Sequence, residues 1–304
     1  MIYTLTLLYP VFGIIAVGYL LCRYRFVKSS WVEKLNYFIY YVSLPAIIIS
    51  LFWKIEFTKT TISYFGFHAV VITVFSLLLI AFLSLFSINR KTKIAVVLGA
   101  MVGNTVYMGY PILKSAFPTL PVEVGMGAGT VQLIVGLLTT VFLVEILIQK
   151  ADKFSAYFLD LIKNPLIIAF VVGAILSFIP HNTTSDTIFN FISYVGQTAS
   201  PLALFTLGVF MNRKFSKQSW LLGGLAIGAK LVLLPLVVLL ASLLLGYNKE
   251  FIQMSVLISA MPTAITSFIL AEKYHLNNEL AADIILVSTV LSIVSLPIVI
   301  WLLG

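Results

Sequence analysis

The sequence predicts an all-α integral membrane protein, and three observations support this prediction. The chain of 304 residues is 61% hydrophobic and only 10% charged, whereas soluble domains carry roughly 25% charged residues. Its mean hydropathy is +1.08. Its apolar residues fall into runs of about 18 to 25 residues, the length that a helix needs to cross a bilayer. We therefore expect helices that span a membrane.

Short polar or basic segments separate these apolar runs. We expect about ten transmembrane helices, near residues 4–22, 32–52, 62–87, 94–118, 124–148, 165–180, 187–211, 220–246, 251–271 and 279–303. Tryptophan and tyrosine gather near the ends of the runs, which is typical of residues at the membrane interface. The first run has no basic segment before it and no small-residue cleavage site after it, so we expect a spanning helix rather than a signal peptide.

The loops between the runs alternate in basic residues. Lysine and arginine gather in the odd-numbered loops, although the ninth loop holds Lys273 beside Glu272 and Glu279. By the positive-inside rule, the odd-numbered loops are cytoplasmic and both termini lie outside. This places a multi-pass protein in the cell (plasma or inner) membrane. The net charge of +8 then needs no nucleic acid partner, because no solvated basic domain is present.

Two runs are interrupted at their midpoints. The run 94–118 contains Gly103-Asn104-Thr105, followed by Gly109 and Pro111. The run 251–271 contains Ser259-Ala260-Met261-Pro262-Thr263. In lipid, a helix can break only where its freed backbone groups face protein or a water-filled cavity. Paired breaks in corresponding positions of two halves indicate the substrate site of a transporter.

The two halves of the chain repeat each other weakly but in a consistent order. Pro10 to Gly18 resembles Pro165 to Gly173, and Val97 to Met101 resembles Val256 to Met261. Because each half holds five spans, the second half must have the opposite orientation. We expect two inverted five-helix repeats, residues 1–150 with helices 1–5 and residues 151–304 with helices 6–10. Broken helices 4 and 9 would then cross near one point.

The half-helices beyond each break would aim unpaired N–H groups and a partial positive charge at that point, which favours an anion. Lys230 lies about ten residues inside the eighth run, where a charge is costly and by default functional. The candidate substrate-binding residues lie at the breaks or are polar within a span: Asn104, Thr105, Gln132, Lys230, Met261, Pro262 and Thr263. Gly103, Gly109 and Pro111 are expected to shape the first break.

Structural alternatives stay open for these residues. Asn104 and Thr105 could be hydrogen-bonding residues between helices, and the prolines could be simple kinks. Lys230 could pair with Asp283 or Glu145, or extend to the membrane surface. Asp283 and His68 are the candidate proton carriers, although a histidine in an apolar helix is more often a packing residue.

No cofactor or metal site is expected. Cys22 is the only cysteine, and the three histidines are scattered along the chain. An intramembrane enzyme would need a Ser/His, paired-Asp or metal constellation, and none is visible. The alternative function is a cation/proton antiporter of similar inverted-repeat architecture, which should show a carboxylate pair near the midplane. The chain is thus expected to be a transporter and not an enzyme.

Several motifs, found in the same order along nearly the whole chain, resemble the auxin efflux carrier (PIN-like) family. They are Gly-Asn-Thr-x-x-Met-Gly-x-Pro at 103–111, Val131-Gln132-Leu133 followed by Glu145, the segment 204–211, Lys230 five residues before Pro235, and Ala260-Met261-Pro262 leading to the segment 268–274. The short link from Gln149 to Asn164 suggests a prokaryotic, short-loop member. Gly103 stands where plant members place a proline, and His68 is the only candidate counterpart of their acidic residue on the third helix.

The resemblance implies a fold, a mechanism and a substrate class. Helices 1, 2, 6 and 7 would form a scaffold domain, and helices 3–5 with 8–10 a transport domain that moves against it like an elevator. Asn104, Gln132 and Pro262 would match the crossover asparagine, the fifth-helix glutamine and the second crossover proline. The substrates would be small organic carboxylates, auxin-like in plants and malate- or malonate-like in bacterial relatives. Membrane lipid and a second copy, bound through the scaffold, are the other expected partners.

Overall fold

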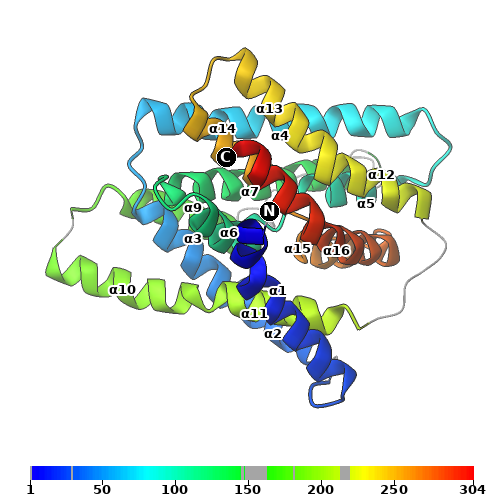
Figure 1. Ribbon diagram of the computed structural model, residues 1–304, viewed down its shortest axis with the longest axis horizontal. Coiled ribbons are helices and arrows are strands. Elements are labelled where there is room, and N and C mark those ends of the chain that lie inside the picture. Colours follow the sequence, from blue (N-terminus) through cyan, green and yellow to red (C-terminus); the bar gives the residue numbers. More distant parts are fainter. Residues whose placement is uncertain (1, 29, 145–146, 148–162, 181, 213–219) are drawn as a thin grey trace.

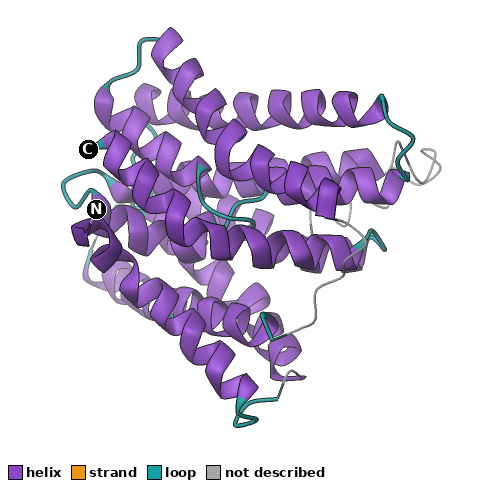
Figure 2. Cartoon of the chain, turned by 45° about the vertical axis from the view of Figure 1, so that its right-hand side comes forward, coloured by secondary structure: helices purple, strands orange, loops and turns teal. Residues whose placement is uncertain are grey.

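The computed structural model describes residues 2–28, 30–144, 147, 163–180, 182–212 and 220–304, and their regular structure is helical (Figures 1 and 2). The first half contains α1 (Ile2–Arg23), α2 (Ser30–Phe38), η1 (Ile39–Ser43), α3 (Leu44–Trp53), α4 (Lys59–Ser84), α5 (Arg90–Met101), η2 (Thr105–Gly109), α6 (Tyr110–Ala116) and α7 (Val122–Val144). The second half contains α9 (Pro165–Leu176), α10 (Thr183–Gln197), α11 (Ala199–Phe210), α12 (Trp220–Gly228), η5 (Ala229–Leu233), α13 (Leu234–Leu244), α14 (Lys249–Ser259), α15 (Thr266–Lys273) and α16 (Asn278–Leu303). Most of the predicted link 149–164 lies outside the described residues.

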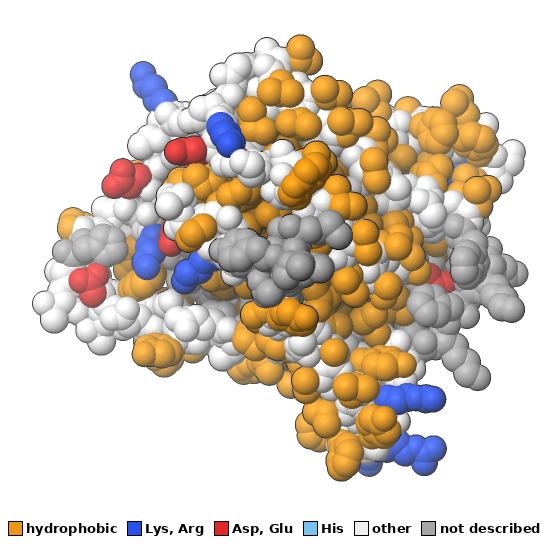
Figure 3. All heavy atoms as spheres, in the orientation of Figure 1, with side chains coloured by type: hydrophobic (Ala, Val, Ile, Leu, Met, Phe, Trp, Pro, Cys, Tyr) orange, Lys and Arg blue, Asp and Glu red, His pale blue; other side chains and the backbone are white. Residues whose placement is uncertain are grey.

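In the described part of the chain, five helical stretches are long and apolar enough to cross a membrane: Ser30–Trp53, Lys59–Ser84, Val122–Val144, Leu221–Leu244 and Asn278–Leu303. Two shorter apolar stretches are Tyr9–Arg23 and Pro165–Leu176. The predicted runs 94–118, 187–211 and 251–271 are each interrupted, so none of them holds one long helix. Hydrophobic side chains cover much of the face in Figure 3, and the charged ones lie mainly toward its edges.

The three segments η1, η2 and η5 are single π-helical turns. η1 and η5 lie inside longer helices, and η2 begins the half-helix that follows the first break. Each is followed by a helix with proline as its second residue, namely Pro45, Pro111 and Pro235. Proline has no N–H to donate to the carbonyl four residues earlier. A π turn, with its bond to the fifth residue back, is one way for the helix to accommodate that loss, as Leu44 N shows by donating to Ile39 O.

Hydrogen bonds group the ends of the helices into two sets. On one side, Arg90 Nη1 donates to Leu147 O at 2.8 Å and Asn277 Nδ2 donates to Thr92 Oγ1 at 3.3 Å. On the other side, Lys249 Nζ donates to the carboxyl-terminal Gly304 O at 3.3 Å. The first set joins loops predicted to be cytoplasmic, and both termini lie toward the same side of Figure 2.

Glycines let two helix pairs approach closely. α1 packs along α11, and α3 packs along α9. A Cβ at Gly208 would overlap the carbonyl oxygen of Ile15, and a Cβ at Gly18 would overlap that of Phe205. A Cβ at Gly173 would lie 2.8 Å from Phe52 Cβ. Small residues at such interfaces allow backbones to touch in a membrane, where apolar burial alone gives little driving force.

We predict that Gly208→Ala lowers the thermal stability of the detergent-purified protein, because the added methyl group forces α1 and α11 apart. Overpacking of this kind costs about 1–3 kcal/mol. The matched control is Gly13→Ala in α1, where nothing lies within 4 Å of the added Cβ. The control should keep or slightly raise the melting temperature, and equal melting temperatures for the two variants would contradict the packing.

Candidate functional site

The two predicted helix interruptions are present, and they meet. α5 ends at Met101 and α14 ends at Ser259. Between them, Gly103 and Thr263 form an isolated antiparallel bridge. Asn104 N donates to Pro262 O at 2.7 Å, and Ala264 N donates to Val102 O at 3.0 Å. Each break therefore supplies backbone partners for the other, as a buried polar backbone requires.

Thr263 ties the bridge to two neighbouring helices. Its Oγ1 donates to Gly99 O at 2.7 Å, and its N–H donates to Ser288 Oγ of α16 at 3.1 Å. Gly99 lies in the last turn of α5, where carbonyl groups have no partner within the helix. The threonine hydroxyl thus replaces a bond that the interruption removes.

Lys230 is fully buried beside the crossing. Its Nζ donates to Ser259 O, the last residue of α14, at 3.0 Å. A Cβ at Gly103 would lie 2.8 Å from that Nζ, so glycine leaves room for the ammonium group there. The sequence suggested Asp283 as a partner for Lys230. Asp283 lies on α16 five residues before Ser288, and five residues correspond to about 7.5 Å along the helix axis. Glu145 lies outside the described residues.

A small cavity of about 10 Å³ lies against the crossing. Its lining comes from α3, from both interruptions, from α7 and from α15: Leu44, Gly103, Asn104, Thr105, Val106, Tyr107, Leu133, Ala264 and Thr266. This volume is on the order of what a single water molecule needs. The crossing is therefore closed around its centre.

Polar groups point to a ligand at this position. Within the described residues, the buried Asn104 Oδ1 has no hydrogen-bond partner. Met108 N is the first amide of the second half-helix to bond back into it, donating to Asn104 O at 3.1 Å. The amides of residues 105–107 therefore belong to the helix start, which carries the partial positive charge. α6 alone is short, but η2 and α6 continue as one element from Thr105 to Ala116.

The other predicted binding residues lie close to the crossing but differ in orientation. Thr105 Oγ1 donates to Gly129 O of α7 at 3.2 Å. Gln132 Nε2 contacts His68 Nδ1 at 2.8 Å and donates to Ser259 Oγ at 3.0 Å, while Gln132 Oε1 has no partner among the described residues. Met261 is fully buried, and Pro262 contributes its carbonyl. Gly109 and Pro111 lie where η2 passes into α6.

Sequence reasoning missed Ser259, Ser288 and Leu44. Ser259 holds both Lys230 and Gln132, and Ser288 accepts from the bridge. Ser259 lies within the second break, but nothing in the sequence distinguishes its side chain from other serines in apolar helices. Ser288 is one of several small polar residues along the apolar α16, which a helix-packing pattern also explains.

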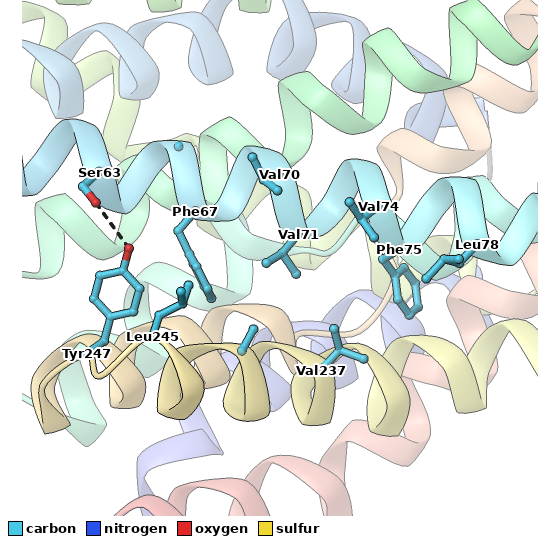
Figure 4. A pocket seen from close by; sticks show the side chains of 12 residues that line it. Ser63, Phe67, Val70, Val71, Val74, Phe75, Leu78, Val237, Leu245 and Tyr247 are labelled. Carbon is cyan, nitrogen blue, oxygen red and sulfur yellow. Dashed lines mark hydrogen bonds between the residues drawn. The ribbon is translucent and has the colours of Figure 1, made fainter.

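A larger cavity of about 500 Å³ lies between α4 and α13 (Figure 4). Its lining is apolar, apart from Ser63 and Tyr247, whose oxygens lie 3.3 Å apart. An anion buried there would have no cationic or backbone donor, and burying an unpaired charge is costly. We therefore place the candidate site at the crossing rather than in this groove.

Comparison with known proteins shows which family the chain belongs to. The profile of the membrane transport protein family, which includes the auxin efflux carriers, matches residues 3–158 and 152–300. The chain belongs to this family. It is a membrane transporter and not an enzyme.

Two known proteins resemble the chain over nearly its whole length, and a third over about half of it. A Rhizobium meliloti protein named "Putative malonate transporter" is 28% identical over 320 residues, covering 98% of this chain and 95% of its own. An uncharacterized transporter of Methanocaldococcus jannaschii is 24% identical, covering 95% and 96%. The rice "Probable auxin efflux carrier component 9" is 31% identical over 160 residues, covering 52% and 34%.

We predict that Thr263→Val destabilises the protein by about 1–3 kcal/mol, because the substitution keeps the shape and leaves Gly99 O buried without a donor. Thermal unfolding in detergent measures the effect. The control is Thr289→Val in α16, since Thr289 Oγ1 donates at 2.7 Å to Ile285 O, which lies within the same helix. A larger loss for Thr289→Val than for Thr263→Val would contradict the role assigned to the bridge.

Proposed function

We propose that this family member is a secondary transporter of a small organic carboxylate and that it binds the anion where the two interrupted helices cross. The observation that carries the proposal is the crossing itself, with the buried Lys230 ammonium against Gly103 and a helix start beside it. Backbone N–H groups, a helix dipole and a cation all favour a negative ligand. The name of the Rhizobium meliloti relative supports malonate as a first substrate to test.

Each of the candidate residues would have a distinct role in binding the anion. The Lys230 ammonium and the amides after Asn104 would hold the carboxylate oxygens, and the Asn104 carboxamide would orient the ligand. Gln132 would contribute from α7. Thr105, Met261, Pro262 and Thr263 would shape the site through the bridge. Mid-membrane sites between discontinuous helices are the typical arrangement in secondary transporters.

Transport would proceed by elevator-type alternating access. The cavity at the crossing holds about one water, so a carboxylate needs the surrounding elements to separate. Leu44 brings α3 into a lining that otherwise comes from the interrupted helices, α7 and α15. We assign α1, α2–α3, α9, α10 and α11 to the scaffold, and α4–α7 with α12–α16 to the moving part. Pairing of two copies through the scaffold stays a prediction.

Two inverted repeats, 1–150 and 151–304, with about ten spans would generate this arrangement. Ser43 and Thr198, which are 155 residues apart, share a hydrogen bond of 2.8 Å between their hydroxyl oxygens. The same offset relates Pro10 to Pro165 in the sequence. Contact between equivalent residues supports a two-fold axis at that point. We further propose that both termini face outward, since the loops grouped around Arg90 and Thr92 are the basic ones.

The antiporter alternative needs a pair of carboxylates near the midplane. Among the described residues, Asp283 is the buried acidic side chain. We therefore keep the carboxylate transporter as the proposed function.

We predict that Asn104→Ala reduces malonate uptake into proteoliposomes at least tenfold, because the ligand loses its orienting amide. Asn190→Ala is the matched control, since Asn190 lies exposed on α10. Both variants should elute as folded protein with similar melting temperatures. Full uptake by Asn104→Ala would remove the site assignment, and absence of uptake of any carboxylate by the unmodified protein would refute the proposed function.

We also predict that linking α3 to the crossing stops transport. In a Cys22→Ser background, Leu44→Cys with Ala264→Cys joins the proposed scaffold to the moving part, because both residues line the same small cavity. The control pair is Thr92→Cys with Asn277→Cys, whose native side chains lie 3.3 Å apart within the proposed moving part. Bifunctional thiol reagents should abolish uptake only for the first pair. Continued transport after complete cross-linking of that pair would contradict the elevator.

A further inference from the structure

A network of buried hydrogen bonds leads from Gln132 at the crossing to His68, Ser255 and Tyr64, to which the proposed site assigns no role. Gln132 Nε2, which donates to Ser259 Oγ, also lies 2.8 Å from His68 Nδ1. His68 Nε2 lies 3.1 Å from Ser255 Oγ, and that hydroxyl donates to Tyr64 OH at 3.3 Å. His68 is fully buried between α4, α7 and α14. This hydrogen-bond network therefore connects His68 to Ser259, whose carbonyl oxygen accepts from Lys230.

The hydrogen-bond donors and acceptors in this network follow from the chemistry of the side chains. In this orientation of the Gln132 carboxamide, Nε2 faces His68 Nδ1; an amide nitrogen can only donate, so Nδ1 accepts and the ring carries its hydrogen on Nε2. Gln132 Oε1 is then left without a partner. A proton arriving at His68 Nδ1 would turn this acceptor into a donor. Gln132 would have to rotate its carboxamide, so that Oε1 accepts from His68 Nδ1 and Nε2 moves to the position that Oε1 leaves.

Charge balance at the site provides the second argument. A dicarboxylate such as malonate carries two negative charges, and an unpaired buried charge is costly. Among the described residues, the buried basic side chains are Lys230 and His68. Lys230 compensates one charge. A proton on His68 would compensate the other, and Gln132 is the single side chain between His68 and Ser259.

Resting on the proposed function, we propose that His68 is the binding site of a proton that enters together with the dicarboxylate, and that rotation of the Gln132 amide couples the two. The proton adds to the Nδ1 lone pair of His68 and leaves from it on the other side of the membrane. The proton is thus a co-transported ion.

The other titratable groups on the packed elements lie farther along the helices or are neutral. Tyr64 lies one turn before His68 on α4, with its ring centroid 4.9 Å away. Tyr247 stacks on Phe251, whose ring lies over His68. The charged groups occupy helix starts: Lys59 on α4, Arg90, Lys91 and Lys93 on α5, Glu123 on α7, and Lys249 and Glu250 on α14. α13 contributes none.

Binding of malonate to purified protein between about pH 6.5 and 8.5 tests the proposal. If one proton binds together with malonate, the affinity for malonate rises by up to tenfold for each unit fall in pH. His68→Gln can still form hydrogen bonds but cannot take up a proton, so this contribution to the pH dependence of the affinity should be lost. His275→Asn is the control, because His275 is exposed at φ 50, a conformation that asparagine tolerates. Protonation of malonate itself affects all proteins equally, so the difference between variants isolates His68.

Two measurements without a His68 substitution complete the test. An inward proton gradient should drive malonate accumulation by the unmodified protein in proteoliposomes. In a protein with His181→Asn and His275→Asn, ¹⁵N NMR of the remaining histidine should change from the neutral to the imidazolium pattern when malonate binds. Malonate transport that ignores pH, an unchanged neutral pattern, or a full pH slope in His68→Gln would each overturn the proton site and leave the proposed function standing. Absence of any carboxylate binding would overturn both.

Discussion

The structure depends on the need to satisfy backbone groups that a broken helix frees in an apolar environment. A single break inside lipid would leave several N–H and C=O groups without partners, each at a cost of several kcal/mol. Here the break after Met101 and the break after Ser259 exchange hydrogen bonds through Val102, Asn104, Pro262 and Ala264. Neither interruption would be tolerable alone. The two halves of the chain are therefore held together at this point.

The same constraint also brings positively charged groups to the proposed site. The bridge satisfies the groups nearest to it, but the starts of the following half-helices keep their positive ends, and Lys230 lies against Gly103. Small or flexible residues are needed where backbone and ammonium meet. Lysine in such a place is expensive unless the site serves a charged ligand. The arrangement that satisfies the freed backbone groups is thus also the one at which we propose that an anion binds.

The membrane class, the two breaks and the residues around them could be predicted from the sequence. Run length and composition determine which segments can lie in lipid, and Gly103 and Pro262 lie at the two interruptions themselves. That the two breaks meet near one point was an expectation from the weak repeat, whereas the pairing of Gly103 with Thr263 was not predicted. The contacts of Lys230 could not be predicted, because Asp283, Glu145 and a backbone carbonyl are all plausible partners until the helices are placed. Ser259 and Ser288 were missed for the same reason, since a serine in an apolar helix usually bonds to its own backbone.

The central claim is that the anion lies at the crossing of the two interrupted helices. The most direct measurement is the position of a bound heavy-atom analogue, by anomalous scattering from crystals of the protein with bromomalonate. The account predicts a bromine peak beside Gly103 and Thr263, within reach of Asn104 and Lys230, with the small cavity there enlarged. A peak in the apolar groove between α4 and α13, with the crossing still closed, would contradict it.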